Sequence, residues 1–211
     1  MFRLSILCLS VLSMASCAEP GTVPHMDVTR SIADTNAEAG ERLLASPPKG
    51  WKLIYQLNNN SIRLTDYIPS DESIGEWETK LSFEAHAQLA GSDPISILMG
   101  EVKSKNEICS HLEHSNLFSG YENNYPTSVR LIQCGENEKS KKGEINLIKA
   151  IAGTDYFYIV RFQKIVPSFE RGEADFTGSE VATWSNYMKQ ISLCDIRGTD
   201  HECPSNDQTQ P

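Results

Sequence analysis

Residues 156–166 read YFYIVRFQKIV and contain the clearest strand pattern of the chain. Every second side chain from Tyr156 onward is apolar or aromatic as far as Phe162, which is the period of a β-strand with one face in a core. The alternate face begins apolar and turns polar at Arg161 and Gln163. This pattern predicts a sheet that packs on one side.

Five other segments have strand character. WKLIYQL and SIRLTDYI are separated by three asparagines at 58–60, which suit a tight turn, so residues 51–68 are predicted to form a hairpin. A third strand is expected within WETKLSFEAHAQLA (77–90), although Ile74, Trp77 and Leu81 also fit helical spacing. SVRLIQC (128–134) and EINLIKAIA (144–152) bring the number of predicted strands to six.

Two helices are predicted between and after these strands. The first begins at Pro94, with Asp93 as its cap, and is expected to reach Cys109 or Leu112. Glu101 and Lys105 would form an i,i+4 pair on its solvent side. The second begins at a capping-box pattern, Thr-Gly-Ser-Glu at 177–180, and is expected to end at Cys194. The apolar stripes are Ile95, Leu98, Met99 and Val102 in the first helix, and Val181, Trp184, Tyr187, Met188 and Ile191 in the second.

The resulting order is β-β-β-α-β-β-β-α with hairpin connections and no β-α-β rhythm. It predicts an α+β domain, with an antiparallel sheet of about six strands and two packed helices. The hairpin that begins at Trp51, the segment IRLTDYIPSDESIGEWE, a helix, three strands and a closing helix resemble the PsbP/DcrB-like fold. Tyr67, Pro69 and Trp77 are similar to a signature of uncharacterised proteobacterial envelope proteins. The resemblance covers roughly residues 50–195, and it implies a binding or assembly module.

The amino terminus is typical of an export signal. A charged start leads into an apolar run from Leu4 to Ala15, and the end of this run is part of Met14-Ala15-Ser16-Cys17, which resembles the lipobox of bacterial lipoproteins. That resemblance implies lipidation of Cys17 after cleavage of residues 1–16. Because Ala18, not aspartate, follows Cys17, it also implies a lipid anchor in the outer membrane that faces the periplasm. The alternative is ordinary cleavage after Ala18, which would leave a soluble periplasmic or secreted protein.

Four cysteines remain downstream, namely Cys109, Cys134, Cys194 and Cys203. An even number of cysteines in an exported chain predicts two disulfides, and four cysteines allow three pairings. Cys194 and Cys203 enclose only eight residues, so they form the natural pair, which leaves Cys109 for Cys134. No C-x-x-C spacing is present to indicate a zinc knuckle or a redox pair.

Composition limits the other possibilities. The 211 residues have a formal net charge of −9, which argues against nucleic acid as a partner. Residues 17–48 are polar, rich in proline and devoid of aromatic side chains, so they are predicted to form a flexible tether. The predicted domain covers residues 49–203, and residues 204–211 are predicted to be a disordered tail.

Candidate site residues are few. His111 and His114 lie three apart near the expected end of the first helix and are weak candidates for metal binding, since two ligands fall short of a stable zinc site. Without a recognisable catalytic motif, we expect no metal, no cofactor and no enzymatic activity. Residues 116–126 are predicted to be a long loop that forms a groove from Tyr121, Tyr125 and Trp77.

These features favour a membrane-tethered, non-catalytic binding or assembly module of the bacterial cell envelope. The expected partners are the membrane, reached through the lipid anchor, and a further envelope protein. The alternative function is a small-ligand carrier or a hydrolase whose site is assembled from scattered residues. A deep pocket would favour the alternative, and a shallow surface with an aromatic patch would favour the module.

Overall fold

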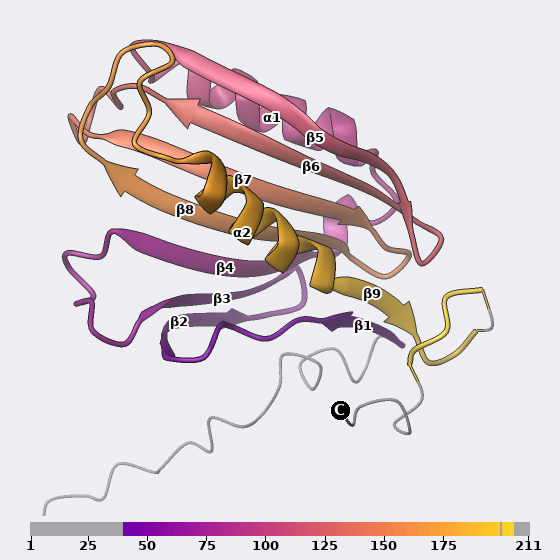
Figure 1. Cartoon of the computed structure of the whole chain (residues 1–211). Coiled ribbons are helices and arrows are strands. Elements are labelled where there is room, and N and C mark those ends of the chain that lie inside the picture. Colours follow the sequence, from indigo (N-terminus) through magenta and orange to yellow (C-terminus); the bar gives the residue numbers. More distant parts are fainter. Residues whose placement is uncertain (1–39, 199, 205–211) are drawn as a thin grey trace, which may run out of the picture.

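The structure is a computed structural model, and it describes residues 40–198 and 200–204. Nine strands and two α-helices follow one another along this part of the chain (Figure 1). In chain order the elements are β1 (Glu41–Leu44), β2 (Trp51–Asn58), β3 (Ile62–Pro69), β4 (Thr79–His86), a 3-10 turn (Ala87–Leu89), α1 (Pro94–Asn106), β5 (Leu112–Glu122), β6 (Tyr125–Cys134), β7 (Gly143–Ala152), β8 (Phe157–Val166), α2 (Gly178–Gln190) and β9 (Ser192–Asp195).

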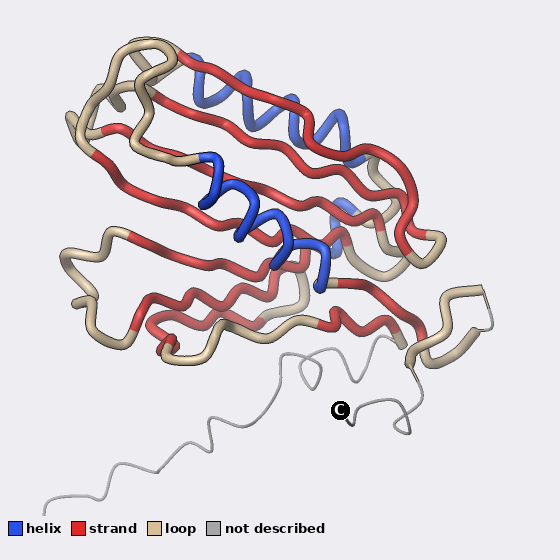
Figure 2. Tube along the Cα trace, viewed as in Figure 1, coloured by secondary structure: helices blue, strands red, loops and turns tan. Residues whose placement is uncertain are grey.

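Seven strands form one antiparallel sheet in the order β2-β3-β4-β8-β7-β6-β5 (Figure 2). The chain passes from β4 through α1 to the far edge at β5, and returns strand by strand until β8 pairs with β4. β1 and β9 form a separate two-stranded sheet. The predicted α+β class, the antiparallel sheet and the two packed helices are therefore confirmed.

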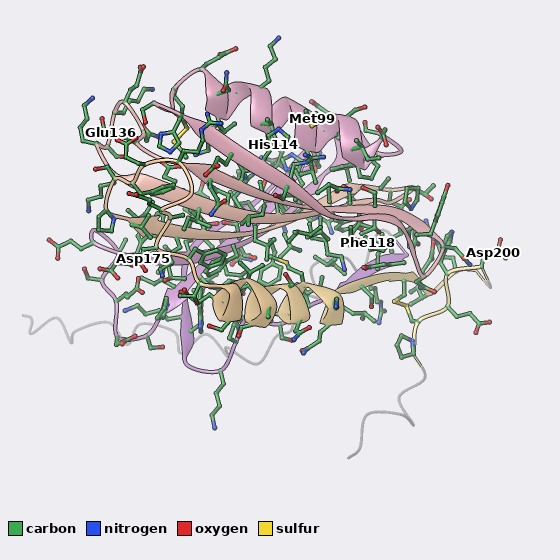
Figure 3. The ribbon with its side chains drawn as sticks, turned by 45° about the horizontal axis from the view of Figure 1, so that its top comes forward. Met99, His114, Phe118, Glu136, Asp175 and Asp200 are labelled. Atoms are coloured by element: carbon green, nitrogen blue, oxygen red, sulfur yellow. A yellow bond between two sulfur atoms is a disulfide. The ribbon has the colours of Figure 1, made fainter. Side chains whose placement is uncertain are left out.

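The prediction of a sheet that packs on one side is wrong. Side chains of even-numbered residues in β7 face α1, side chains of odd-numbered residues face α2, and all ten residues of the strand are buried. Figure 3 shows α1 and α2 on opposite sides of the sheet. The sheet is packed on both faces because Phe157 and Ile159 of β8 join a second core with Leu98 and Val102 of α1.

Both helices begin where the sequence predicts. The Asp93 carboxylate accepts from the backbone N–H groups of Ile95 and Ser96 at the start of α1. Thr177 and Glu180 form a complete capping box at the start of α2. At the other end of α2, the buried ammonium of Lys149 donates to the carbonyl oxygens of Met188 and Ile191, at 2.8 and 2.6 Å. A cation is favourable there, because the last carbonyls of a helix lack intrahelical donors.

Three strands, β1, β9 and β5, lie outside the predicted set. β1 falls within residues 17–48, the segment predicted as a flexible tether, and pairs with β9. The Glu41 carboxylate of β1 is fully buried and accepts from the backbone N–H groups of Thr154, Asp155 and Tyr156 at 2.5, 2.9 and 3.4 Å. The third strand, β5, occupies most of the predicted 116–126 loop, which is a hairpin instead.

The predicted disulfide pairing is confirmed. Cys109 is bonded to Cys134, and Cys194 is bonded to Cys203. The first disulfide joins the segment after α1 to the end of β6, and the second closes the loop after β9. Among the described residues, neither helix has the length and apolar character that crossing a membrane requires.

Candidate binding surfaces

The three aromatic residues predicted to form a groove do not meet. Tyr121 is 73% exposed near the end of β5, whereas Tyr125 is 2% exposed and packs in the core with its ring 3.9 Å from that of His201. The two tyrosines belong to adjacent cross-strand pairs of the hairpin, and side chains of adjacent pairs point to opposite faces. Trp77 precedes β4, at the other end of the sheet, where the ammonium of Lys80 lies 5.1 Å from its ring centroid.

The β5 edge, defined as residues 115–122, is the first candidate binding surface. β5 is the outermost strand of the sheet, and within the described residues its only strand neighbour is β6. Residues 115–121 carry no charged side chain, and Leu117, Phe118 and Tyr121 are exposed by 41%, 37% and 73%. An edge strand of this kind offers unpaired backbone groups and apolar side chains together.

The hairpin that presents the β5 edge is held firmly. Asn123 and Asn124 both adopt positive φ, 45° and 63°, as a two-residue hairpin turn requires. Their side-chain amides donate to backbone oxygens of β9 and of the C-terminal disulfide loop, and the ring of His201 contacts the Asn123 carbonyl. A β-bulge between Asn116 and Phe118 leaves Leu117 as the extra residue and bends the strand. Phe118 and His114, which comes before the bulge in the same strand, lie on opposite sides of the sheet (Figure 3).

The second candidate surface is an open cavity of about 280 Å³, which we call the polar basin. It lies on the α1 side of the sheet, where α1 packs on β5, β6 and β7 and leaves β3 and β4 uncovered. Its walls combine polar, charged and one apolar side chain from four strands and α1. They are Leu64, Asp66, Lys80, Ser82, Glu84, Lys105, Asn146, Arg161 and Gln163.

Opposite charges are paired around the polar basin. Arg161 donates to both carboxylate oxygens of Glu101, at 3.2 and 3.1 Å, and its Nε lies 3.6 Å from Glu84. Lys105 pairs with Glu144, so the predicted pair of Glu101 with Lys105 on the solvent side of α1 is wrong. Both side chains turn inward because the sheet supplies closer partners than the helix surface does.

The pKa values around Arg161 follow from this network. Burial tends to raise the pKa of Glu84, but the hydrogen bond from His86 and the charge of Arg161 outweigh burial and lower it. Burial likewise opposes the charge of Arg161, yet Glu84 and Glu101 raise its pKa. Glu84 and Arg161 therefore both stay ionised near neutral pH.

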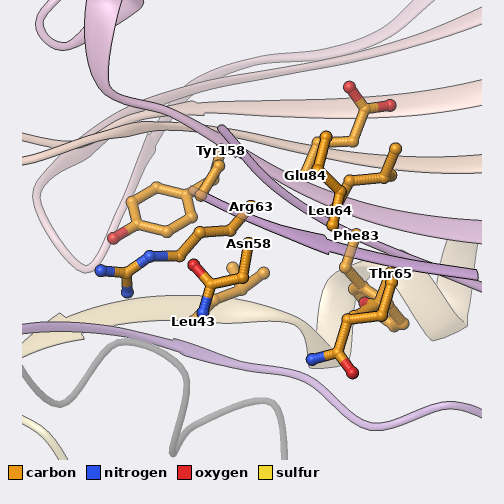
Figure 4. A pocket seen from close by; sticks show the side chains of 11 residues that line it. Leu43, Asn58, Arg63, Leu64, Thr65, Phe83, Glu84 and Tyr158 are labelled. Atoms are coloured by element: carbon orange, nitrogen blue, oxygen red, sulfur yellow. The ribbon is translucent and has the colours of Figure 1, made fainter. Parts of the chain in front are cut away.

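A smaller cavity lies on the opposite face of β3 and β4 (Figure 4). Leu43, Arg63, Phe83 and Tyr158 are among its lining residues, and its volume is about 20 Å³. A cavity of this size holds about one water molecule. Neither cavity is the large, deep pocket that a carrier of a bulky ligand would need.

The two candidate metal ligands lie in different surroundings. The ring of His111 packs edge-on against Phe169, with ring centroids 5.7 Å apart. His114 lies on β5, where its Nδ1 is 2.9 Å from the guanidinium of Arg130, and a neighbouring cation disfavours metal binding. In residues 40–198 and 200–204, no three His, Cys, Asp or Glu side chains are grouped to hold a metal ion. Cys17 lies outside the described residues.

Sequence reasoning located the first candidate surface within residues 116–126 but predicted a loop where the structure has an edge strand, and it missed the polar basin. For the β5 edge, the Asn-Asn dipeptide at 123–124, between Glu122 and Tyr125, was an available turn signal. For the polar basin no local signal exists, because its residues come from five separate elements.

Comparison with known proteins gives only distant similarities. No protein-family model and no curated protein matches the sequence. LpqN of Mycobacterium tuberculosis, described as involved in cell envelope biogenesis, is similar at 11% identity and a TM-score of 0.40, over 72% of this chain and 83% of LpqN. PA94 of Pseudomonas aeruginosa, a protein of unknown function, is similar at 11% identity and a TM-score of 0.37, over 66% and 92%. A mutant of the protein Mog1 is similar at 11% identity and 0.40, over 74% and 97%. Similarities this distant assign no activity, ligand or partner.

Proposed function

We propose that this protein is a non-catalytic binding module of the bacterial cell envelope. It is held at the outer membrane by lipid on Cys17, and it captures an extended segment of another envelope protein along the β5 edge. The observation that carries the proposal is the long outer strand of an otherwise well-packed sheet, in which residues 115–121 are uncharged and partly apolar. An extended peptide can add to such an edge as an eighth strand.

The geometry favours a peptide over a second copy of this chain. The bulge at Leu117 bends and twists β5, so two rigid copies would pair poorly along its length. A short, flexible segment can follow the bend and cover residues 118–122 with main-chain hydrogen bonds. Phe118 and Tyr121 lie on opposite faces of this stretch, and they would receive alternate side chains of the bound segment.

The two disulfides support the assignment to the envelope, because disulfides persist in oxidising compartments such as the periplasm. A shallow protein surface in place of a deep pocket also favours a binding module over a hydrolase.

Crosslinking from the edge tests the capture of a partner. A photo-crosslinking amino acid at Leu117 is compared in living cells with the same group at Leu53, which is similarly exposed beside the bulge of the opposite edge strand, β2. We expect one discrete adduct from Leu117 only. Tyr121→Ala should reduce it about tenfold, as loss of a central aromatic contact does. Equal adducts from both positions, or an adduct with a second copy of the chain, would contradict the proposal.

The anchor is tested separately. Cys17→Ser should remove the lipid and release the protein from membranes into the soluble periplasm, which fractionation and intact-mass measurement will detect. A Cys17→Ser variant that stays with the membranes, together with an unlipidated wild type, would refute the anchor and leave the β5 edge unaffected.

A further inference from the structure

Two polar atoms beside the polar basin lack partners. Asp66 Oδ1 and Asn146 Nδ2 are buried, and no hydrogen-bond partner for either lies among the described residues. Asn146 as a whole is 1% exposed, and it forms part of the basin wall. Because buried polar groups in native proteins nearly always have partners, one unpaired acceptor and one unpaired donor in a single cavity suit a ligand that bonds to both.

The charges around the basin exclude a simple ion as that ligand. Its three cations, Lys80, Lys105 and Arg161, each pair with a carboxylate, from Asp66, Glu144, or Glu84 and Glu101. An anion would have to displace a carboxylate, and a cation would meet three positive groups. A neutral ligand avoids both conflicts, and it can still bond to the remaining lone pairs and N–H groups of the paired residues.

Strand register sets the length of the ligand. Asp66 lies opposite Ser82 of β4, and Ser82 lies opposite Arg161 of β8. Asn146 of β7 lies opposite Gln163, two residues further along β8. The two unpaired groups are thus three strand spacings apart across the sheet, about 14 Å, and two residues, about 7 Å, apart along it. A ligand that reaches both must be extended and cannot be a single small molecule such as glycerol.

We propose that the polar basin binds a neutral, polyhydroxylated ligand of about disaccharide length. Each hydroxyl can donate to a carboxylate such as Asp66 and accept from an amide such as Asn146. Leu64 provides an apolar patch for the C–H face of a sugar ring. Tyr55 of β2 is the cross-strand partner of Asp66, so its half-exposed ring lies at the basin rim on the same face. This site is separate from the β5 edge and does not depend on the function proposed above.

Titration with defined sugars tests the proposal. The probes are cellobiose, maltose and N,N′-diacetylchitobiose, added to the full-length mature protein, with backbone amide NMR shifts as the readout. We expect at least one probe to shift resonances of β3, β4 and β8. Asn146→Leu, which keeps the volume and removes the amide donor, should weaken binding about tenfold, as loss of one hydrogen bond typically does. Gln163→Ala tests the basin wall with little risk to folding.

Gln133→Ala is the matched control, because this glutamine lies on β6 and faces the opposite side of the sheet, beside Ile145. Its affinity should equal that of the wild type. A dissociation constant of about 10 mM is the weakest expected of such a site. If none of the three disaccharides shifts a resonance at about 10 mM, the proposal is overturned. Preferential binding of inorganic phosphate, or weakening by Gln133→Ala as large as by Gln163→Ala, would overturn it as well.

Co-sedimentation distinguishes the two sources of such a ligand. Binding of the protein to purified peptidoglycan that is abolished by Asn146→Leu would identify a glycan within the wall polymer. Binding of the soluble disaccharides alone would identify a free glycan. Either result supports the proposed ligand class.

Discussion

Replacement of Glu41 by glutamine should detach β1 from the domain. The Glu41 carboxylate accepts three backbone N–H groups of the turn between β7 and β8, at 2.5 to 3.4 Å, and lies 3.4 Å from the hydroxyl of Tyr158. Glutamine keeps one acceptor oxygen but turns an NH₂ group toward N–H donors. Oε1 accepts only from Thr154, whereas Oε2 accepts the other contacts, so Glu41→Gln removes one hydrogen bond in its better orientation and takes the charge away from the others, in a fully buried position.

The expected loss follows from the energy of these contacts. A hydrogen bond to a charged group contributes about 1.5–3 kcal/mol and one to a neutral group about 0.5–1.5 kcal/mol. The loss of one bond and the weakening of the others, partly offset by the lower desolvation cost of a neutral amide, should therefore reduce the free energy of unfolding by about 3 kcal/mol. In a domain of this size, 1 kcal/mol shifts Tm by about 2–4 °C. We therefore expect Tm to fall by about 6–12 °C.

Urea unfolding followed by tryptophan fluorescence will measure the free energy, and hydrogen exchange of the β1 amides will show whether β1 opens by itself. Glu138→Gln, at an exposed position in the loop before β7, is the control and should change stability by less than about 0.5 kcal/mol. A Glu41→Gln protein within about 0.5 kcal/mol of the wild type, with unchanged exchange at β1, would refute this reasoning. β1 lies within residues 17–48, the segment predicted as a tether, so its attachment to the domain affects how the domain is held.

Three further outcomes are expected. Lys149→Met removes the ammonium donor from two carbonyls at the end of α2, of which Met188 keeps the bond from the Ile191 N–H, and should lower the free energy of unfolding by about 2 kcal/mol in urea titrations. An unchanged midpoint would show that water replaces the ammonium. The folded-state pKa of Glu84 lies below its ordinary value of 4.5, so this carboxylate stabilises the fold above pH 4.5, and the stabilisation is lost as pH falls through the folded-state pKa. Glu84→Gln should therefore flatten the curve of unfolding free energy against acid pH. A curve identical to that of the wild type would contradict the role of the Glu84, His86 and Arg161 contacts. Replacing Cys194 and Cys203 with serine opens a short loop and should lower the free energy of unfolding by about 2–3 kcal/mol in calorimetry. An unchanged free energy of unfolding would show that the wild-type protein does not form this disulfide.

The sequence by itself determined most of the regular structure. Strong alternation predicted β6, β7 and β8, and three asparagines predicted the turn between β2 and β3. Capping residues placed the starts of both helices, because a side-chain oxygen such as that of Asp93 or Thr177 satisfies free N–H groups of the first turn wherever the helix packs. The short spacing of Cys194 and Cys203 predicted the disulfide pairing, since nearby cysteines meet at low cost in chain entropy. All these signals act within a few residues of the chain.

Only the tertiary structure decided the rest. β5 escaped prediction because an edge strand with six exposed residues in a row shows no apolar alternation, and its pairing depends on β6. The four-residue strands β1 and β9 are held by residues far along the chain, with Glu41 contacting residues 154–156. The sequence pattern puts Arg161 on the polar part of its strand, and only the packing of α1 on the sheet places Glu101 within hydrogen-bond distance of it. The polar basin depends on strand register, which puts Asp66 and Asn146 on one face although 80 positions separate them in the sequence. Long-range pairing, which no local pattern encodes, therefore created both candidate surfaces.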